Sequence, residues 1–230
     1  MNYTKIDIDS WERRDLFKLY TTDLKIVMNM TVDVDITDML SEIKKNGLRF
    51  YPAMIWIVSR LMNARDEFKY CLTEEGELIK WDYVSPSYTD FNKETEKFNK
   101  FVTEYSPDFK TFYERVVSDC EKHKNETGFL PNQPKNTFDI TCLPWTTYKS
   151  FDLHIYGDGK SLFPIVFWGK YHEVDGRIII PVTAMLHHAV GGEQQCALHL
   201  RDVGANGGVQ GYARDFTGQS RPLARGQFKA

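Results

Sequence analysis

Hydrophobic and polar residues follow regular spacings along most of the first 190 residues of the chain. Residues 26–36, IVMNMTVDVDI, alternate between the two kinds, which predicts a half-buried strand. Residues 53–64, AMIWIVSRLMNA, are almost wholly apolar and follow Pro52, so we expect a buried helix there. Residues 38–46 are expected to form a helix that ends at Gly47, in the position of a C-cap.

Further elements are expected as far as residue 190. They are a short amphipathic helix over 11–20, a hairpin over 69–91 with its turn at EEGE, a helix from Ser106 to about residue 125, a strand over 137–148 that Pro144 interrupts, and a long hairpin of 161–173 and 177–190 around VDG. Strands and helices mix without a strict βαβ rhythm. The expected fold class is therefore α/β (α+β), with a large mixed β-sheet flanked by helices.

The composition changes abruptly after residue 190. Up to that point there are 17 lysines and 7 arginines, whereas residues 191–230 contain four arginines and one lysine, Lys229. Eight of the 15 glycines also fall in this last segment, which has neither a helical nor a strand period. We therefore expect one domain over 1–190, followed by an atypical Gly-rich tail over 191–230 that is flexible.

Overall composition narrows the class of protein. A formal charge of −3 over 230 residues offers no basic field for nucleic acid or an anionic membrane. No apolar run approaches the ~18 residues of a membrane span, and the polar N-terminus lacks a signal sequence, so we expect a cytoplasmic protein. The four cysteines are too sparse for a disulfide framework and are expected to be unpaired thiols.

Two adjacent histidines, His187 and His188, end the apolar run that precedes this change. On a strand, neighbouring side chains point to opposite faces, which argues against a metal ion held by both. We therefore expect no metal site. A histidine is neutral and basic at cellular pH, so one of the pair could be a general base, and a purely structural histidine is the alternative.

Other residues suggest chemistry less specifically. Ser150 lies between aromatic residues, where its hydroxyl could stabilise an oxyanion or cap a turn. Neither a GxSxG nor a GxxxxGK[ST] motif occurs. Several aromatic residues could line a pocket for a flat ligand or simply form core: Tyr20, Tyr51, Phe91, Phe98 and Trp145.

Taken together and in order, five blocks resemble the type-A chloramphenicol acetyltransferases. They are MNYTKIDIDSWERRDLF, FYPAMIWIVSR, SYTDFNKETEKF, LPWTTYKSFDLHI and GKYHEVDGRIIIPVTAMLHHAV, and they span about residues 1–190. The resemblance implies a CoA-dependent acyltransferase fold, assembled as a homotrimer with active sites between subunits. It implies transfer of acetyl from acetyl-CoA, a co-substrate and not a permanently bound cofactor, to the 3-hydroxyl of chloramphenicol.

The resemblance also assigns roles to single residues. The family motif HHxxxDG makes His188 the general base, and the family's oxyanion serine falls on Ser150. Other matched positions are expected to contact the antibiotic, namely Tyr20, Ile26, Met28, Thr89 and Phe98. Tyr51, Lys170 and Tyr171 are expected to lie near the CoA channel.

The chain departs from the family at two places. Phe167 stands where many members carry a threonine beside the substrate. Gly192 replaces the aspartate of HHxxxDG, which in the family pairs with an arginine that falls here on Arg13. Two interpretations of the segment after residue 190 follow: an altered reading frame or joined foreign segment, or a diverged terminus that still functions. The chain could accordingly have either of two functions. It could be an active acetyltransferase, or an impaired homologue that binds CoA or drug without turnover.

Overall fold

A computed structural model of the chain describes residues 2–92 and 94–192. Its helical segments are α1 (Arg14–Lys18), the π-helical turn η1 (Leu19–Asp23), α2 (Thr37–Lys45), α3 (Phe50–Asn63), the 3-10 turn η2 (Asp66–Phe68) and α4 (Phe109–His123). Its strands are β1 (Tyr3–Lys5), β2 (Val27–Asp35), β3 (Tyr70–Leu72), β4 (Leu78–Trp81), β5 (Ser85–Asn92), β6 (Lys97–Val102), β7 (Gly128–Phe129), β8 (Thr137–Leu143), β9 (Ile165–Gly169), β10 (His172–Val174) and β11 (Arg177–His187).

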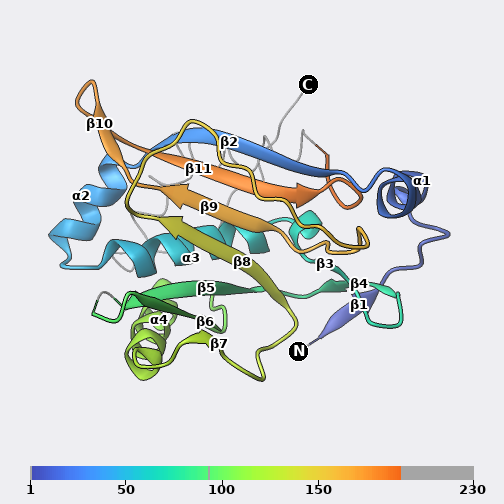
Figure 1. Cartoon of the computed structure of the whole chain (residues 1–230), viewed down its shortest axis with the longest axis horizontal. Coiled ribbons are helices and arrows are strands. Elements are labelled where there is room, and N and C mark those ends of the chain that lie inside the picture. The colour runs from blue at the N-terminus through green and yellow to red at the C-terminus, as the bar shows by residue number, and fades with distance from the viewer. Residues whose placement is uncertain (1, 93, 193–230) are drawn as a thin grey trace.

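The strands of the described residues form one large mixed sheet and one small sheet. The large sheet has eight strands in the order β10-β11-β9-β8-β5-β6-β7, with β2 paired to the outer side of β11 (Figure 1). The small sheet has the order β1-β4-β3. The expected fold class, a large mixed sheet flanked by helices, is confirmed.

The longest pairing in the large sheet joins β2 and β11, which are antiparallel. It runs from Ile179 opposite Asp35 to His187 opposite Val27. The other side of β11 pairs with β9 and then β10, as the expected long hairpin requires. Because β11 has neighbours on both sides over much of its length, its residues from Ile180 onward are buried and the histidine pair follows a strand that is held on both sides.

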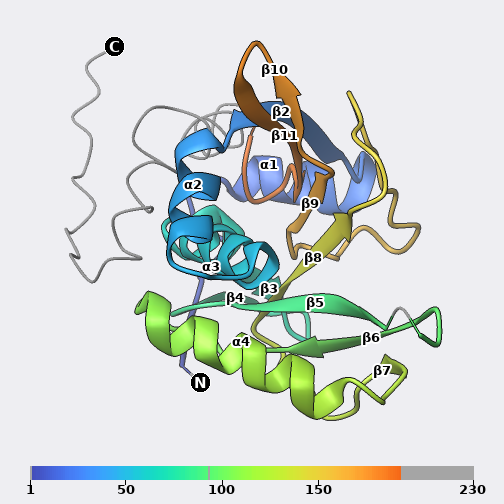
Figure 2. The ribbon, with the colours of Figure 1, turned by 90° about the vertical axis from the view of Figure 1, so that its left-hand side faces the viewer.

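Helices α2, α3 and α4 lie on one face of the large sheet (Figure 2). α3 is the central one, and ten of its fourteen residues are buried. Its side chains Met54, Trp56 and Ile57 are almost inaccessible and form the main core with Val182 and Ala184 of β11. An apolar helix can be buried in this way because both the sheet and α4 cover it.

The irregular segment 144–164, which joins β8 to β9, covers part of the opposite face (Figure 2). Phe151 of this segment packs edge-on against Phe167, with ring centroids 5.2 Å apart. A chain of hydroxyl groups fixes the same segment to the sheet: Thr31 and Thr183 lie 2.7 Å apart, and Thr183 donates to Tyr148 at 3.3 Å. Tyr148 in turn donates to the carbonyl oxygen of Phe167 at 3.3 Å.

The expected elements are present, with differences of extent. The helix expected over 11–20 is only five residues long as α1, because the chain then widens into the π-helical turn, in which Leu24 N–H donates to the carbonyl of Leu19 at 3.0 Å. The strand expected over 137–148 ends at Leu143, just before Pro144, which cannot donate to a ladder. The sequence does not predict β1, β6 or β7: β1 and β7 have only three and two residues, and β6 (KFNKFV) lacks a strict alternation of apolar and polar residues.

The buried hydroxyl chain gives a prediction for stability. Thr183→Val removes its central hydroxyl and leaves Thr31 and Tyr148 without that partner, so unfolding should become easier by about 1–3 kcal/mol. Urea denaturation measures the change. Thr4→Val, at an exposed strand position, is the control and should change stability by less than about 0.5 kcal/mol. Equal losses in the two variants would contradict a role for the chain of hydroxyls.

Candidate active site

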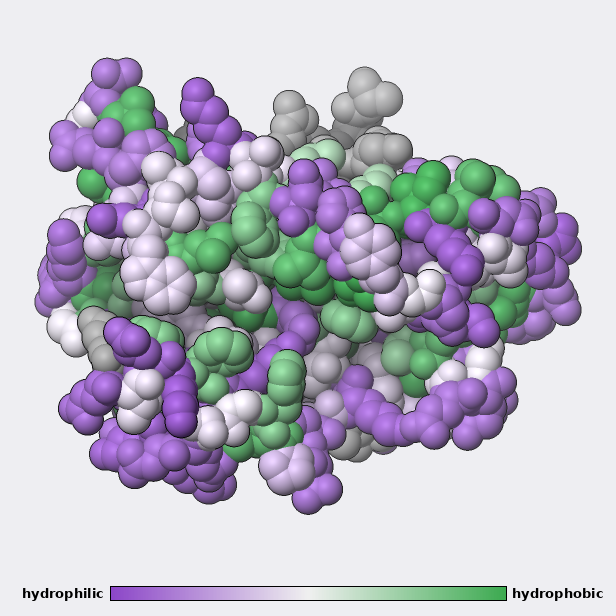
Figure 3. Space-filling model, viewed as in Figure 1, coloured by the Kyte–Doolittle hydropathy of each residue, from purple (hydrophilic) through white to green (hydrophobic). Residues whose placement is uncertain are grey.

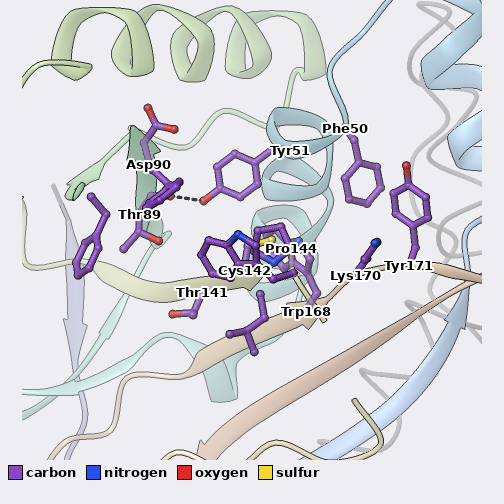
Figure 4. A pocket seen from close by; sticks show the side chains of 15 residues that line it. Phe50, Tyr51, Thr89, Asp90, Thr141, Cys142, Pro144, Trp168, Lys170 and Tyr171 are labelled. Atoms are coloured by element: carbon purple, nitrogen blue, oxygen red, sulfur yellow. Dashed lines mark hydrogen bonds between the residues drawn. The ribbon is translucent and has the colours of Figure 1, made fainter. Parts of the chain in front are cut away.

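A cavity of about 860 Å³ lies where β5 and β8 diverge. The two parallel strands pair only as far as Tyr88 opposite Ile140, yet β5 continues to Asn92 and β8 to Leu143. Side chains of α3 and of the end of β9 complete the walls (Figure 4). The volume is that of a site for a sizeable organic ligand.

The walls of this cavity are mainly aromatic. They include Phe91, Phe98, Trp145 and Trp168, and Phe91 packs edge-on against Trp145 at 5.6 Å. Close packing at the end of β9 depends on Gly169, since a Cβ there would lie 2.9 Å from the carbonyl oxygen of Thr146. This close approach brings the segment after β8 over the cavity.

The polar groups in the wall of the cavity include a tyrosine hydroxyl and a cysteine thiol. The Tyr51 hydroxyl donates to the carbonyl oxygen of Thr89 at 2.6 Å, and burial raises the pKa of Tyr51 well above its usual value (Figure 4). Burial also raises the pKa of the Cys142 thiol to about 12. Cys142 is therefore a neutral wall group and a poor nucleophile.

Lys170 and Tyr171 lie on the side of the cavity next to Phe50, away from Thr89 and Asp90 (Figure 4). Both are exposed and follow the end of β9, where Lys170 N–H donates to Thr146 at 2.8 Å. The Tyr171 ring meets Phe50 edge-on at 5.5 Å. An ammonium group beside aromatic rings at the open side of an apolar cavity can receive an anionic, partly aromatic ligand.

A second group of the expected site residues surrounds His188, just past the end of β11. The imidazole of His188 stacks on the ring of Tyr20, with centroids 4.2 Å apart and planes at 8°. The backbone N–H of His188 donates to the backbone carbonyl oxygen of Ile26 at 2.9 Å. Met28 of β2 lies opposite Leu186 of β11. Tyr20 reaches this place because the π-helical turn redirects the chain between α1 and β2.

The hydrogen bond of His188 defines its chemistry. Nδ1 lies 3.2 Å from the carbonyl oxygen of Gly191. A carbonyl oxygen can only accept, so in the neutral ring the hydrogen is on Nδ1 and Nε2 is the basic nitrogen. His188 is thus arranged to remove a proton through Nε2.

Arg13 holds the turn that follows His188. Its guanidinium donates to the carbonyl oxygens of His188 at 3.1 Å and Ala189 at 3.5 Å. In the part of the chain that the structure describes, Arg13 pairs with no carboxylate, and Gly192 provides none. The arginine therefore still touches the turn, through backbone oxygens in place of a carboxylate.

Ser150 is exposed in the segment 144–164 and makes no hydrogen bond with another described residue. Its neighbour Phe151 packs on Phe167, which anchors the serine's backbone against the sheet. Within one chain the structure does not join Ser150 to His188 by a hydrogen bond.

The expected site residues thus form two groups in a single chain. Five of them line the cavity: Tyr51, Thr89, Phe98, Lys170 and Tyr171. The others around His188 do not line it. Trp168, at the cavity, pairs with Val182, and His188 lies six residues further along β11, a separation of about 20 Å at the rise of a strand.

The chain matches the family model described as chloramphenicol acetyltransferase over residues 1–202. It is also 38% identical over 192 residues to the chloramphenicol acetyltransferase of Clostridium butyricum, covering 83% of this chain and 88% of that relative. The chain belongs to the chloramphenicol acetyltransferase family.

Further relatives agree with the family assignment. Chloramphenicol acetyltransferase 2 of Escherichia coli is 35% identical over 192 residues, covering 83% of this chain and 90% of that protein. A solved chloramphenicol acetyltransferase superposes with a TM-score of 0.79 at 19% identity, over 92% of this chain and all of that one. The dihydrolipoamide acetyltransferase of Azotobacter vinelandii has the same fold, with a TM-score of 0.58 at 14% identity over 84% of this chain and 83% of that one. These results identify the chain as an acetyltransferase.

Several cavity residues escaped the sequence interpretation, among them Phe50, Asp90, Cys142 and Trp168. They lie on separate elements and share no local motif, so no short-range signal marks them. Of the aromatic residues considered for a pocket, Tyr51, Phe91, Phe98 and Trp145 line the cavity, whereas Tyr20 stacks on His188.

Two features are absent from the described residues. No cluster of three or more potential metal ligands occurs there, and no helix there is long and apolar enough to cross a membrane. The expected tail over 191–230 lies outside the described residues, apart from Gly191 and Gly192.

Proposed function

We propose that this chain transfers acetyl from acetyl-CoA to the 3-hydroxyl of chloramphenicol, with His188 as the general base. The observation that carries the proposal is the Nδ1 contact of His188 with the Gly191 carbonyl, which leaves Nε2 to take a proton. The family membership supplies the substrates. We assign the reaction to the cytoplasm, where acetyl-CoA is available.

In the proposed reaction Nε2 of His188 removes the hydroxyl proton as the oxygen attacks the thioester carbonyl. The hydroxyl of Ser150 donates a hydrogen bond to the oxyanion that forms. Collapse of this intermediate breaks the C–S bond, and the CoA thiolate leaves with the proton that His188 holds. No acyl-enzyme is required, and the high pKa of Cys142 argues against that thiol as an acyl carrier.

The cavity suits acetyl-CoA at its open side. Lys170 supplies a positive charge for phosphate groups, and Tyr171 supplies a ring face for the base. Apolar walls around Tyr51 and Trp168 suit the pantetheine arm. We assign Thr89 and Phe98, on the other side of the cavity, to the antibiotic together with Tyr20, Ile26 and Met28.

The separation of the two groups supports active sites shared between copies of the chain. A single chain keeps His188 about 20 Å along β11 from the cavity. Apolar side chains gather across the middle of one face of the molecule (Figure 3), and Leu24, Phe98 and Trp145 are among the exposed large hydrophobic residues. We propose a homotrimer in which His188 of one copy meets the cavity of the next.

One observation favours the second candidate, an impaired homologue. Gly192 removes the carboxylate that Arg13 pairs with in the family, and Arg13 binds carbonyl oxygens in its place. A charged pair would hold the turn after His188 more firmly than these contacts do.

The first experiment is CoA release from acetyl-CoA by the purified full chain, with and without chloramphenicol. Drug-dependent release is expected, and His188→Ala should lower kcat by about 10²–10⁴. His172→Ala, which alters an exposed histidine on β10, is the control and should keep full activity. Absence of release from a folded wild-type sample would favour the impaired homologue, and an active His188→Ala variant would reject His188 as the base.

A complementation experiment checks the shared site. His188→Ala chains and Thr89→Trp chains, whose cavity is filled, should each be inactive alone. Co-expressed chains should regain activity, because random assembly leaves about one interfacial site in four intact. Size-exclusion chromatography with light scattering measures the assembly. Mixed assemblies without activity would show that the base and the cavity must come from one chain.

The missing carboxylate gives a third prediction. Gly192→Asp should raise kcat and stabilise the chain by about 1–2 kcal/mol, because the new carboxylate can pair with Arg13. Gly192→Asn is the neutral control, and adding Arg13→Gln to Gly192→Asp should remove the gain. Steady-state kinetics and thermal unfolding give the two readouts. Equal gains from Asp and Asn would contradict an ion pair.

A further inference from the structure

His187, the neighbour of the proposed base, is a buried imidazole that the reaction does not use. Its side chain is only 2% exposed, and it is the last residue of β11. Its Nδ1 accepts a hydrogen bond from the backbone N–H of Ala189 at 3.2 Å. A nitrogen that accepts has no hydrogen of its own, so the hydrogen of the neutral ring is on Nε2.

The two adjacent histidines therefore make opposite kinds of hydrogen bond with the same turn: His187 accepts and His188 donates. The turn of residues 188–191 donates an N–H to Nδ1 of His187 and accepts from Nδ1 of His188 through the Gly191 carbonyl. The two rings consequently hold opposite tautomers. Only His188 is left with a basic Nε2.

The other side of the His187 ring faces the segment that carries Ser150. Nε2 is buried and has no hydrogen-bond partner among the described residues, and the backbone of Gly159 is close enough to act on the pKa of the ring. Gly159 has a φ of +79°, and a Cβ there would lie 2.6 Å from Cγ of Lys25. Lys25 directly precedes Ile26, whose carbonyl accepts the N–H of His188.

The ring can keep its accepting role only while it is neutral. Burial lowers the pKa of His187, and the neighbouring His188 lowers it further, against the effect of the Gly159 backbone. The pKa therefore lies below the usual 6.5, so at neutral pH the lone pair of Nδ1 is available to the N–H of Ala189.

We propose that His187 is a positioning residue, whose Nδ1 holds the turn of residues 188–191 at the end of β11 and so fixes the backbone that carries His188. The proposal rests on the proposed function for its kinetic consequences only. This role differs from that of a core histidine that only stabilises the fold. The hydrogen bond accepted by Nδ1 of His187 sets the position of the backbone that carries His188.

Two substitutions separate these roles. In His187→Asn the amide oxygen can occupy the place of Nδ1 and accept from Ala189, whereas His187→Leu fills the space without an acceptor. We expect kcat of the Asn variant to stay close to that of the unaltered chain, and kcat of the Leu variant to fall roughly 10- to 100-fold. KM for acetyl-CoA should be unchanged in both, because neither His187 nor the turn that follows it lines the cavity.

Val116→Ala in α4 is the matched control, since it removes buried core volume from an element that carries neither the turn nor the segment of Ser150. Measured well below the unfolding temperature, its kcat should equal that of the unaltered chain. A Leu variant with unaltered kcat, or an Asn variant that loses as much as Leu, would overturn the proposal.

Imidazole ¹⁵N NMR gives a readout that needs no activity. At neutral pH the expected spectrum of the full chain has His187 protonated on Nε2 and His188 protonated on Nδ1. In His187→Leu the Ala189 amide signal should shift and His188 should lose its single tautomer. Protonation of His187 on Nδ1 would overturn the proposal, whereas the expected spectrum in a chain without drug-dependent CoA release would count against the proposed function alone.

Discussion

The antiparallel pairing of β2 with β11 is the interaction on which the rest of the structure depends. It continues without a break to His187 opposite Val27, and the next residue still donates to the carbonyl of Ile26. The rigid ladder therefore ends at the histidine pair. Because only residues 24–26 separate the π-helical turn from β2, the same pairing brings Tyr20 and Arg13 against His188.

A second constraint is the divergence of β5 from β8. Where two parallel strands separate, the side chains between them lose their neighbours on the other strand. The space between the strands is then either filled by core side chains or left as a cavity. Here the ends of the strands are lined with rings and with groups already bonded to the backbone, such as Tyr51 to Thr89, so a cavity persists. The helix α3 supports it from behind because nearly all of its length is buried.

Backbone groups of one turn contact both imidazoles of the histidine pair. One N–H and one C=O of a single turn give adjacent imidazoles opposite tautomers. Arg13 adds two further contacts to backbone carbonyl oxygens of that turn. The described part of that turn is therefore held to Arg13 through its own backbone carbonyl oxygens.

The sequence by itself determined most elements and the family. The alternation in 26–36 and the apolar run in 53–64 are local signals of the 2.0 and 3.6 periods, and β2 and α3 form where they indicate. The five blocks likewise marked His188 and Ser150 as the residues to examine. Only the tertiary structure decided what surrounds those residues, because the divergence of β5 from β8, the pairing of β2 with β11 and the stacking of Tyr20 on His188 arise from contacts between segments far apart in the chain. A single chain also keeps the base apart from the cavity, because Trp168 at the cavity pairs with Val182 in the middle of β11, whereas His188 follows the last residue of that strand.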